Sequence, residues 1–303
     1  MLKRMDFFLL LGLAMGPAGA QEAHLGGEDD AAARAAAAAE FEASLDFKQG
    51  MVTLPNGVAT LEVPEGFRYA GPDDARRVLE QGWGNPDGHG TLGMLFPVDI
   101  GVVSEGSWGV VISYEEDGHV SDADADAIDY DAMLAGMRSA IAQENEARER
   151  AGYEPLQIVG WAAKPRYDKA AKKLYWAKEL KFGDAASHTL NYNIRILGRS
   201  GVLVMNAVSG MDQMARVEQD MQQVLAFTNF VPGQRYADYD AATDKLAAYG
   251  LGALVAGGVA AKTGLLTKLV ALLVASKKLI ILGVLAQAAV LGKALMGRRG
   301  TSA

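Results

Sequence analysis

The stretch TLNYNIRILGRSGVLVMNAV, residues 189–208, decides the fold of this 303-residue chain. It contains two strand-like runs, residues 189–197 and 202–208, which are separated by the short turn sequence GRSG. Two similar runs, residues 156–162 and 174–182, precede it. Runs of this length that are joined by short turns are typical of antiparallel strands that follow one another in space. The sequence therefore predicts an antiparallel meander of four strands.

Further strand and helix signals flank this meander. Asn56-Gly57 is a strong hairpin turn signal between two apolar runs. Pro72, followed by two aspartates, fits the first turn of a helix. The predicted strands outside the meander are 51–54, 58–63, 67–70, 91–97 and 108–114, and the predicted helices are 72–80, 130–150 and 211–227. The sequence thus predicts an α+β fold in which helices pack on an antiparallel sheet.

The two ends of the chain differ in composition from its middle. Lys3 and Arg4, a short apolar run and the small residues before Gln21 predict a secretory signal peptide over residues 1–20. The predicted organisation continues with an acidic, alanine-rich spacer at 21–50, a soluble α+β domain at 51–232, a juxtamembrane linker at 233–245, a transmembrane anchor at 246–297 and a tail at 298–303. Tyr236, Tyr239 and Tyr249 suit the aromatic belt of a membrane interface.

The apolar segment from Leu246 onward contains no acidic residue, and residues 246–266 are long enough to cross a bilayer. Small residues recur in this segment at a spacing that lets a second helix approach closely. These helix-packing candidates are Gly252, Ala256, Gly257, Ala260 and Gly264. A second apolar run at 279–296 follows Lys277 and Lys278. We expect a helical hairpin that spans twice, and the alternative is a single span beside an interfacial helix.

Composition restricts the possible chemistry. The chain has no cysteine, which excludes disulfides, thiol catalysis and cysteine metal sites. Its net charge is −8, and the tail from Leu246 onward carries no acidic residue, so the middle of the chain is more acidic than the whole. An acidic domain repels nucleic acid. We therefore expect the membrane and proteins as partners, and no nucleic acid.

Residues 161–182, which we call the basic hairpin, combine cationic and aromatic side chains. The candidate partner or lipid contacts here are Trp161, Lys164, Arg166, Lys172, Lys173, Tyr175 and Trp176. One interpretation is docking on anionic lipid headgroups or on an acidic partner. The other is an ordinary hairpin whose lysines protect an edge strand from aggregation. A further candidate is Trp83, among three glycines, as either a contact residue or a core side chain.

Signals for catalysis are weak. Asp122, Asp124 and Asp126 alternate like the start of a calcium loop, but the glycine and glutamate that complete such a loop are absent from the sequence. Histidines 24, 89, 119 and 188 show no zinc or catalytic spacing. We predict no metal and no cofactor. The open alternative is an enzyme in which Ser107 or Ser113 meets a histidine of the loops.

Five segments resemble one bacterial family. They are LPNG at 54–57, GWGNP at 82–86, LYWA at 174–177, LNYN at 190–193 and DKLAAYG at 244–250. The family is known as domain of unknown function 2167 and is described as membrane-anchored. The resemblance implies an envelope protein with a signal, a soluble domain and a C-terminal anchor, and it implies no reaction. The strand order also resembles the photosystem-accessory or Mog1-like sandwich, which is a likeness of fold alone.

These observations lead to one expected function and one alternative. We expect a binding or assembly module that is anchored in the bacterial cytoplasmic (inner) membrane, exposed to the periplasm, and associated with an envelope protein or with itself. The alternative is a hydrolytic or metal-dependent envelope enzyme that uses loop histidines and carboxylates.

Overall fold

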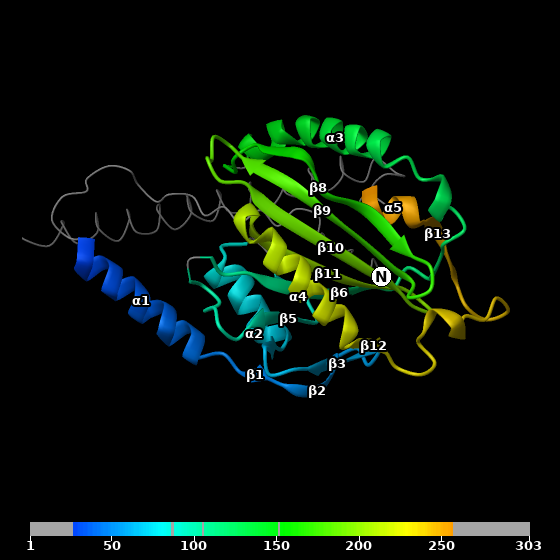
Figure 1. Ribbon diagram of the computed structural model, residues 1–303, viewed down its shortest axis with the longest axis horizontal. Helices are drawn as coiled ribbons and strands as arrows, with labels where there is room; N and C mark the ends of the chain where they lie inside the picture. The colour runs from blue at the N-terminus through cyan, green and yellow to red at the C-terminus, as the bar shows by residue number, and fades with distance from the viewer. Residues whose placement is uncertain (1–26, 86–87, 105, 151, 257–303) are drawn as a thin grey trace, which may run out of the picture.

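The computed structural model describes residues 27–256 except 86–87, 105 and 151 (Figure 1). Its centre is an eight-stranded antiparallel sheet in the order β1-β4-β5-β6-β11-β10-β9-β8. The strands are β1 (Phe47–Lys48), β4 (Phe67–Ala70), β5 (Gly93–Pro97), β6 (Gly109–Glu115), β8 (Leu156–Asp168), β9 (Lys173–Phe182), β10 (Thr189–Leu197) and β11 (Val202–Gly210). The predicted meander is confirmed, and β11 joins it to β6 in the middle of the sheet.

Two smaller sheets and five α-helices complete the domain (Figure 1). One small sheet has the order β12-β3-β2, and in the other β7 pairs with β13. These strands are β2 (Gly50–Thr53), β3 (Ala59–Val63), β7 (His119–Ser121), β12 (Thr228–Phe230) and β13 (Leu246–Gly250). The α-helices are α1 (Gly27–Ala43), α2 (Pro72–Arg77), α3 (Tyr130–Arg150), α4 (Met214–Ala226) and α5 (Leu251–Ala256), and α2 continues into a π-helical turn, Val78–Gly82.

The two faces of the large sheet are covered differently. On one face, which we call the α4 face, α4 and the β12-β3-β2 sheet bury one large apolar cluster (Figure 1). Leu190, Tyr192 and Ile194 of β10 belong to this cluster and point to this side. The residues opposite them on β11 share the same face. The other face, the α5 face, carries three separate clusters, under α2, under α3, and under β13 with α5.

The α+β architecture and most predicted elements are confirmed, including the hairpin around Asn56-Gly57 and the helix at 130–150. The segment expected to be a spacer, 21–50, instead supplies α1 and β1. Phe41 at the end of α1 packs on the cluster beneath α2, and Glu42 forms an ion pair of 2.6 Å with Arg68. The folded domain therefore begins before residue 51.

The predicted start of the transmembrane anchor is wrong. Residues 246–250 form β13, which runs parallel to β7, and Leu251, Leu254 and Val255 of α5 are buried in the domain. Among helices of the described residues, none is long and apolar enough to cross a membrane. The predicted signal peptide at 1–20 and the part of the predicted anchor from Gly257 onward, with Ala260 and Gly264, lie outside the described residues.

Candidate functional site

Three lysines of the basic hairpin face an acidic loop, which comprises residues 122–131. Lys172 contacts the Asp122 carboxylate at 2.7 Å, Lys169 contacts Asp126 at 2.5 Å, and Lys164 contacts Asp131 at 3.1 Å. The partners are separated by 33 to 50 residues in the chain. Much of the positive charge that stands out in the sequence is thus balanced inside the domain.

The aromatic and remaining basic side chains of this hairpin also have internal contacts. Trp176 is 2% exposed and belongs to the cluster beneath α5. The Trp161 indole donates to the Tyr130 carbonyl at 3.3 Å, and the Lys173 ammonium donates to the Leu225 carbonyl at 2.9 Å. The guanidinium of Arg166 lies over the ring of Tyr175, 4.4 Å from its centre. The predicted contact residues are therefore distributed over both faces of the sheet, and Trp176 has almost no surface for a partner.

Trp83, the other aromatic candidate, is a core side chain. It is 7% exposed, packs edge-on against Phe96 and donates from its indole nitrogen to the Val102 carbonyl at 2.8 Å. These contacts favour the second of its two interpretations, because they leave little of the ring for a ligand.

The strongest convergence of polar groups binds the C-terminal part of the chain to the domain. We call residues 231–256 the C-terminal latch. Arg199, in the β10–β11 turn, contacts the Asp244 carboxylate through two nitrogens at 2.8 and 3.0 Å. This paired hydrogen bonding lowers the pKa of Asp244 to about 2. The latch is thereby held at a turn of the central meander.

His119 of β7 forms a second contact of the latch. Its ring stacks on Tyr239 at 3.9 Å and lies 4.2 Å from Tyr236. Burial is the main cause that lowers the pKa of His119. Tyr249 is also buried, and its hydroxyl donates to Asp117 at 2.9 Å. Tyr249 is buried, and the half-buried Tyr236 and Tyr239 contact His119, so these tyrosines have partners within the domain, which argues against the predicted interfacial belt.

Two carboxylates of the acidic loop connect the latch to the rest of the fold. Asp122 accepts hydrogen bonds from Tyr167 at 2.8 Å, Lys172 at 2.7 Å and Tyr236 at 3.1 Å. Burial opposes its ionisation, but these three donors together hold the pKa of Asp122 below its usual value. Asp122 thus joins the basic hairpin, the acidic loop and the latch.

Asp124 caps the first turn of α5. Its two carboxylate oxygens accept from the backbone of Leu251 at 3.0 Å and of Gly252 at 3.1 Å. A Cβ on Gly250 would lie 2.6 Å from this carboxylate, so the glycine allows the close approach. Gly252 and Ala256, which we predicted to pack membrane helices, belong instead to this capped helix of the domain.

The three described histidines, which the enzyme alternative would use, lie at separate places. His89 lies 3.9 Å from Glu80, His119 stacks in the latch, and His188 contacts Glu179 at 2.5 Å. Within the described ranges, no group of three or more histidines and carboxylates is placed to hold a metal ion. The three alternating aspartates have different partners and do not converge on one point.

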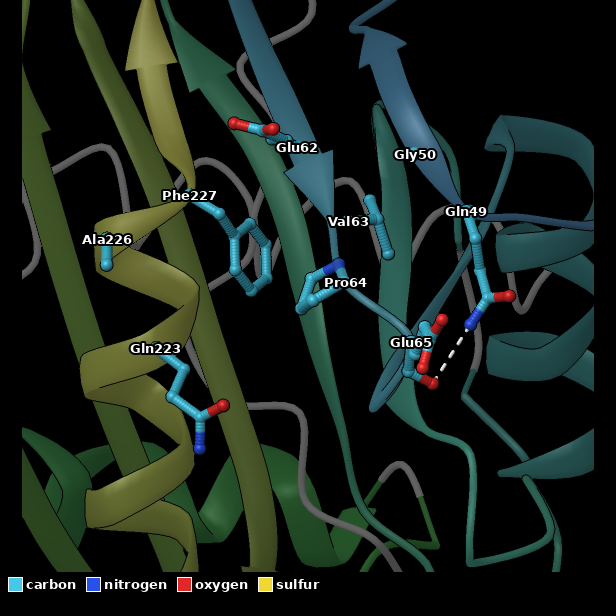
Figure 2. Close-up of a pocket in the computed structure, with 9 residues that line it drawn as sticks. All are labelled: Gln49, Gly50, Glu62, Val63, Pro64, Glu65, Gln223, Ala226 and Phe227. Carbon is cyan, nitrogen blue, oxygen red and sulfur yellow. Dashed lines mark hydrogen bonds between the residues drawn. The ribbon is translucent and has the colours of Figure 1, made fainter.

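A shallow pocket of about 620 Å³ lies between the β2–β3 sheet and the end of α4 (Figure 2). Gln223, Ala226 and Phe227 form one side, and Gln49 donates to the Glu65 carbonyl at 3.0 Å on the other (Figure 2). The pocket opens to solvent. None of the described residues that line it is a histidine, serine, lysine or arginine, so its charged side chains are the carboxylates Glu62 and Glu65.

Sequence reasoning missed Arg199, Asp244 and the cap made by Asp124 as the residues that fasten the latch. The family segment DKLAAYG contained a usable signal, because it begins with Asp244 and ends with Gly250. A charged residue has no evident role in a lipid-facing helix, but Asp244 suits a salt bridge. Gly250 suits a close approach of another group to the backbone.

A family model described as "Protein of unknown function (DUF2167)" matches residues 46–288. No match was found among curated proteins. Solved structures that are similar to this chain include the following two. The solution structure of cyanobacterial PsbP (CyanoP) from Synechocystis has 12% identity and a TM-score of 0.33, over 62% of this chain and 94% of that one. The Ran-binding protein Mog1p of Saccharomyces cerevisiae has 13% identity and a TM-score of 0.30, over 65% of this chain and 100% of that one.

Proposed function

The chain belongs to the DUF2167 family of proteins of unknown function, and we propose that it is a membrane-attached binding module. In this proposal the α+β domain is exported to the periplasm, and the apolar sequence after α5 attaches it to the cytoplasmic membrane. The domain contacts another envelope protein or a second copy of itself.

The observation that carries the proposal is the way in which the C-terminal latch ends. Residues 246–256 are part of the folded domain, held by Asp124 and by the buried side chains of α5. The apolar sequence that follows therefore leaves from a fixed point of the domain surface. Residues 257–296 contain no acidic side chain and are long enough to cross a hydrocarbon core of about 30 Å.

A binding role is supported further by the arrangement of polar groups. His119 stacks on a tyrosine of the latch, and the carboxylates of the acidic loop accept from backbone, tyrosine and basic donors. Such contacts hold the domain in one arrangement. A binding surface requires a fixed arrangement of this kind. A catalytic site would bring a nucleophile and a base together.

Two truncations test the membrane attachment. A chain that ends after Ala256 keeps β13 and α5, and we expect it to fold and to remain in the soluble fraction. The full chain is expected to sediment with membranes and to require detergent for extraction. A chain that ends after Lys245 is the matched control, since it loses Leu251, Leu254 and Val255 from the core and should unfold more easily.

The proposal is wrong if the full chain and the chain that ends after Ala256 fractionate alike. Crosslinking in intact cells then tests the binding role. Recovery of one stoichiometric partner, or of a crosslinked dimer, with the full chain supports it. Recovery of the uncrosslinked protein alone contradicts it.

A further inference from the structure

The α5 face of the large sheet contains a band of polar side chains where its apolar clusters meet. On β9, Leu174 and Trp176 belong to the cluster under α5, and Leu180 and Phe182 belong to the cluster under α3. Lys178 lies between them on the same face, because successive even positions of a strand point the same way. Lys178 is 8% exposed.

The band continues across the neighbouring strands. On β10, Asn191 lies opposite Lys178, and Asn193 lies opposite Trp176. Asn193 in turn lies opposite Asn206 of β11. Arg195 follows on β10, is 5% exposed, and donates to the Asn206 side chain at 3.0 Å. Each of these side chains is therefore on the α5 face. The alternate residues of β10, Leu190, Tyr192 and Ile194, are on the α4 face and are apolar.

Hydrogen-bond donors predominate in this band. Arg195 donates to the Ile194 carbonyl and to the Asn206 side chain, whereas the Trp176 and Lys178 donors lack acceptors among the described residues. The Trp176 indole nitrogen is buried and has no hydrogen-bond partner. Lys178 forms no ion pair or hydrogen bond with any described residue, and Arg195 forms no ion pair with one. Glu115 is the acidic group whose charge acts on Arg195, but it is not within ion-pair distance, and burial raises its pKa.

Buried donors and charges normally have partners, because an unpaired one loses its hydration without compensation. The sequence after Ala256 has lysines and arginines and no acidic side chain, so that segment offers no counter-charge. Guanidinium and ammonium groups with an indole N–H form a donor set that matches an oxyanion.

We propose that the band of Lys178, Arg195 and Trp176 on the α5 face binds an oxyanion group, a phosphate or carboxylate of a small molecule or of a lipid headgroup. This proposal concerns a bound anion and does not rest on the proposed binding of a protein partner. It does not depend on membrane attachment, so either proposal can fail alone. The desolvation that lowers the pKa of Lys178 to about 8 is consistent with a cation that awaits an anion.

The full chain, purified in a zwitterionic detergent, provides the test. Inorganic phosphate, acetate and mixed micelles that contain phosphatidylglycerol are the three probes, and thermal shift and calorimetric titration are the readouts. We expect at least one probe to raise the melting temperature. Response to a soluble anion identifies a free ligand, whereas response to the mixed micelles alone identifies a lipid headgroup.

Lys178→Met is the decisive variant, and Lys178→Gln is a second one in case the first folds poorly. Each should weaken binding of the active probe about tenfold to a hundredfold, the usual effect of losing one charge-assisted hydrogen bond. Lys164→Met is the matched control, because Lys164 is exposed on the same hairpin and pairs with Asp131. The proposal is overturned if no probe changes the melting temperature, or if the Lys164 and Lys178 variants respond as the native chain does.

Discussion

At the scale of single residues, the carboxylates of the acidic loop determine how distant segments meet. Asp122 accepts three hydrogen bonds, two from the basic hairpin and one from the latch. Asp124 accepts two from α5. Hydrogen bonds to a charged acceptor are worth roughly 1.5–3 kcal/mol each when they are shielded from water. The alternating aspartates that resemble a calcium loop in the sequence thus serve as acceptors for protein donors.

Lys178 allows a prediction about stability. In the absence of an anion, its buried ammonium is unpaired, and desolvation lowers its pKa to about 8. Replacement by methionine removes the charge and keeps the shape, so Lys178→Met should raise the free energy of unfolding at neutral pH by roughly 1–3 kcal/mol. Urea unfolding of the full chain in detergent, without phosphate, measures this difference.

The same substitution has a defined pH dependence. Between about pH 8 and the ordinary lysine pKa near 10.5, the unfolded chain holds this proton and the folded chain has lost it. The unfolding free energy of the native protein therefore rises with pH in this window relative to that of Lys178→Met, and the advantage of the variant should shrink. A constant difference between pH 7 and pH 10.5 would contradict the assignment.

At the scale of elements, α5 is a short helix whose position depends on its cap. Asp124→Ala removes both acceptors from the first turn of α5. Loss of a capping side chain costs about 1–2 kcal/mol, so the variant should lose about that much unfolding free energy. Denaturant unfolding of the chain that ends after Ala256 measures the change without detergent.

Asp126→Ala is the control for this prediction, since it lies two residues away in the same loop. Its partner, Lys169, is well exposed, and exposed ion pairs contribute little. We expect Asp126→Ala to change stability by less than about 0.5 kcal/mol. Equal losses in the two variants would show that Asp124 does not hold α5.

At the scale of the whole molecule, the distribution of charge bears on the proposed membrane attachment. Lys164, Lys169 and Lys172 pair with acidic residues of the domain, so the basic hairpin is a weak attractor for anionic lipids. The proposed attachment through the apolar residues 257–296 would be insensitive to salt. We therefore expect the full chain to remain on membranes at 1 M NaCl, where the Debye length is about 3 Å.

Flotation with phosphatidylglycerol liposomes measures this association. The double variant Lys164→Glu and Lys169→Glu should float as well as the native chain does. Release by salt, or failure of the double variant to float, would instead assign the membrane contact to the hairpin. A chain that ends after Ala256 serves as the negative control.

Local sequence by itself determined the α+β class, the four-strand meander, the helix at 130–150 and the Asn56-Gly57 turn. These features depend on the period of apolar residues and on turn residues that act within a few positions. The sequence also determined that no cysteine chemistry is possible and that the tail lacks acidic side chains.

Only the tertiary structure decided what the apolar residues 246–256 and the hairpin lysines contact. Hydrophobicity reports that a segment leaves water, but not whether lipid or protein replaces the water. Leu251, Leu254 and Val255 are buried in the domain because β13 pairs with β7, a strand more than 120 residues earlier. Likewise, Lys172 is paired because Asp122 lies 50 residues away in the chain and close by in space. Contacts over such separations follow from how the whole chain closes, which no local pattern encodes.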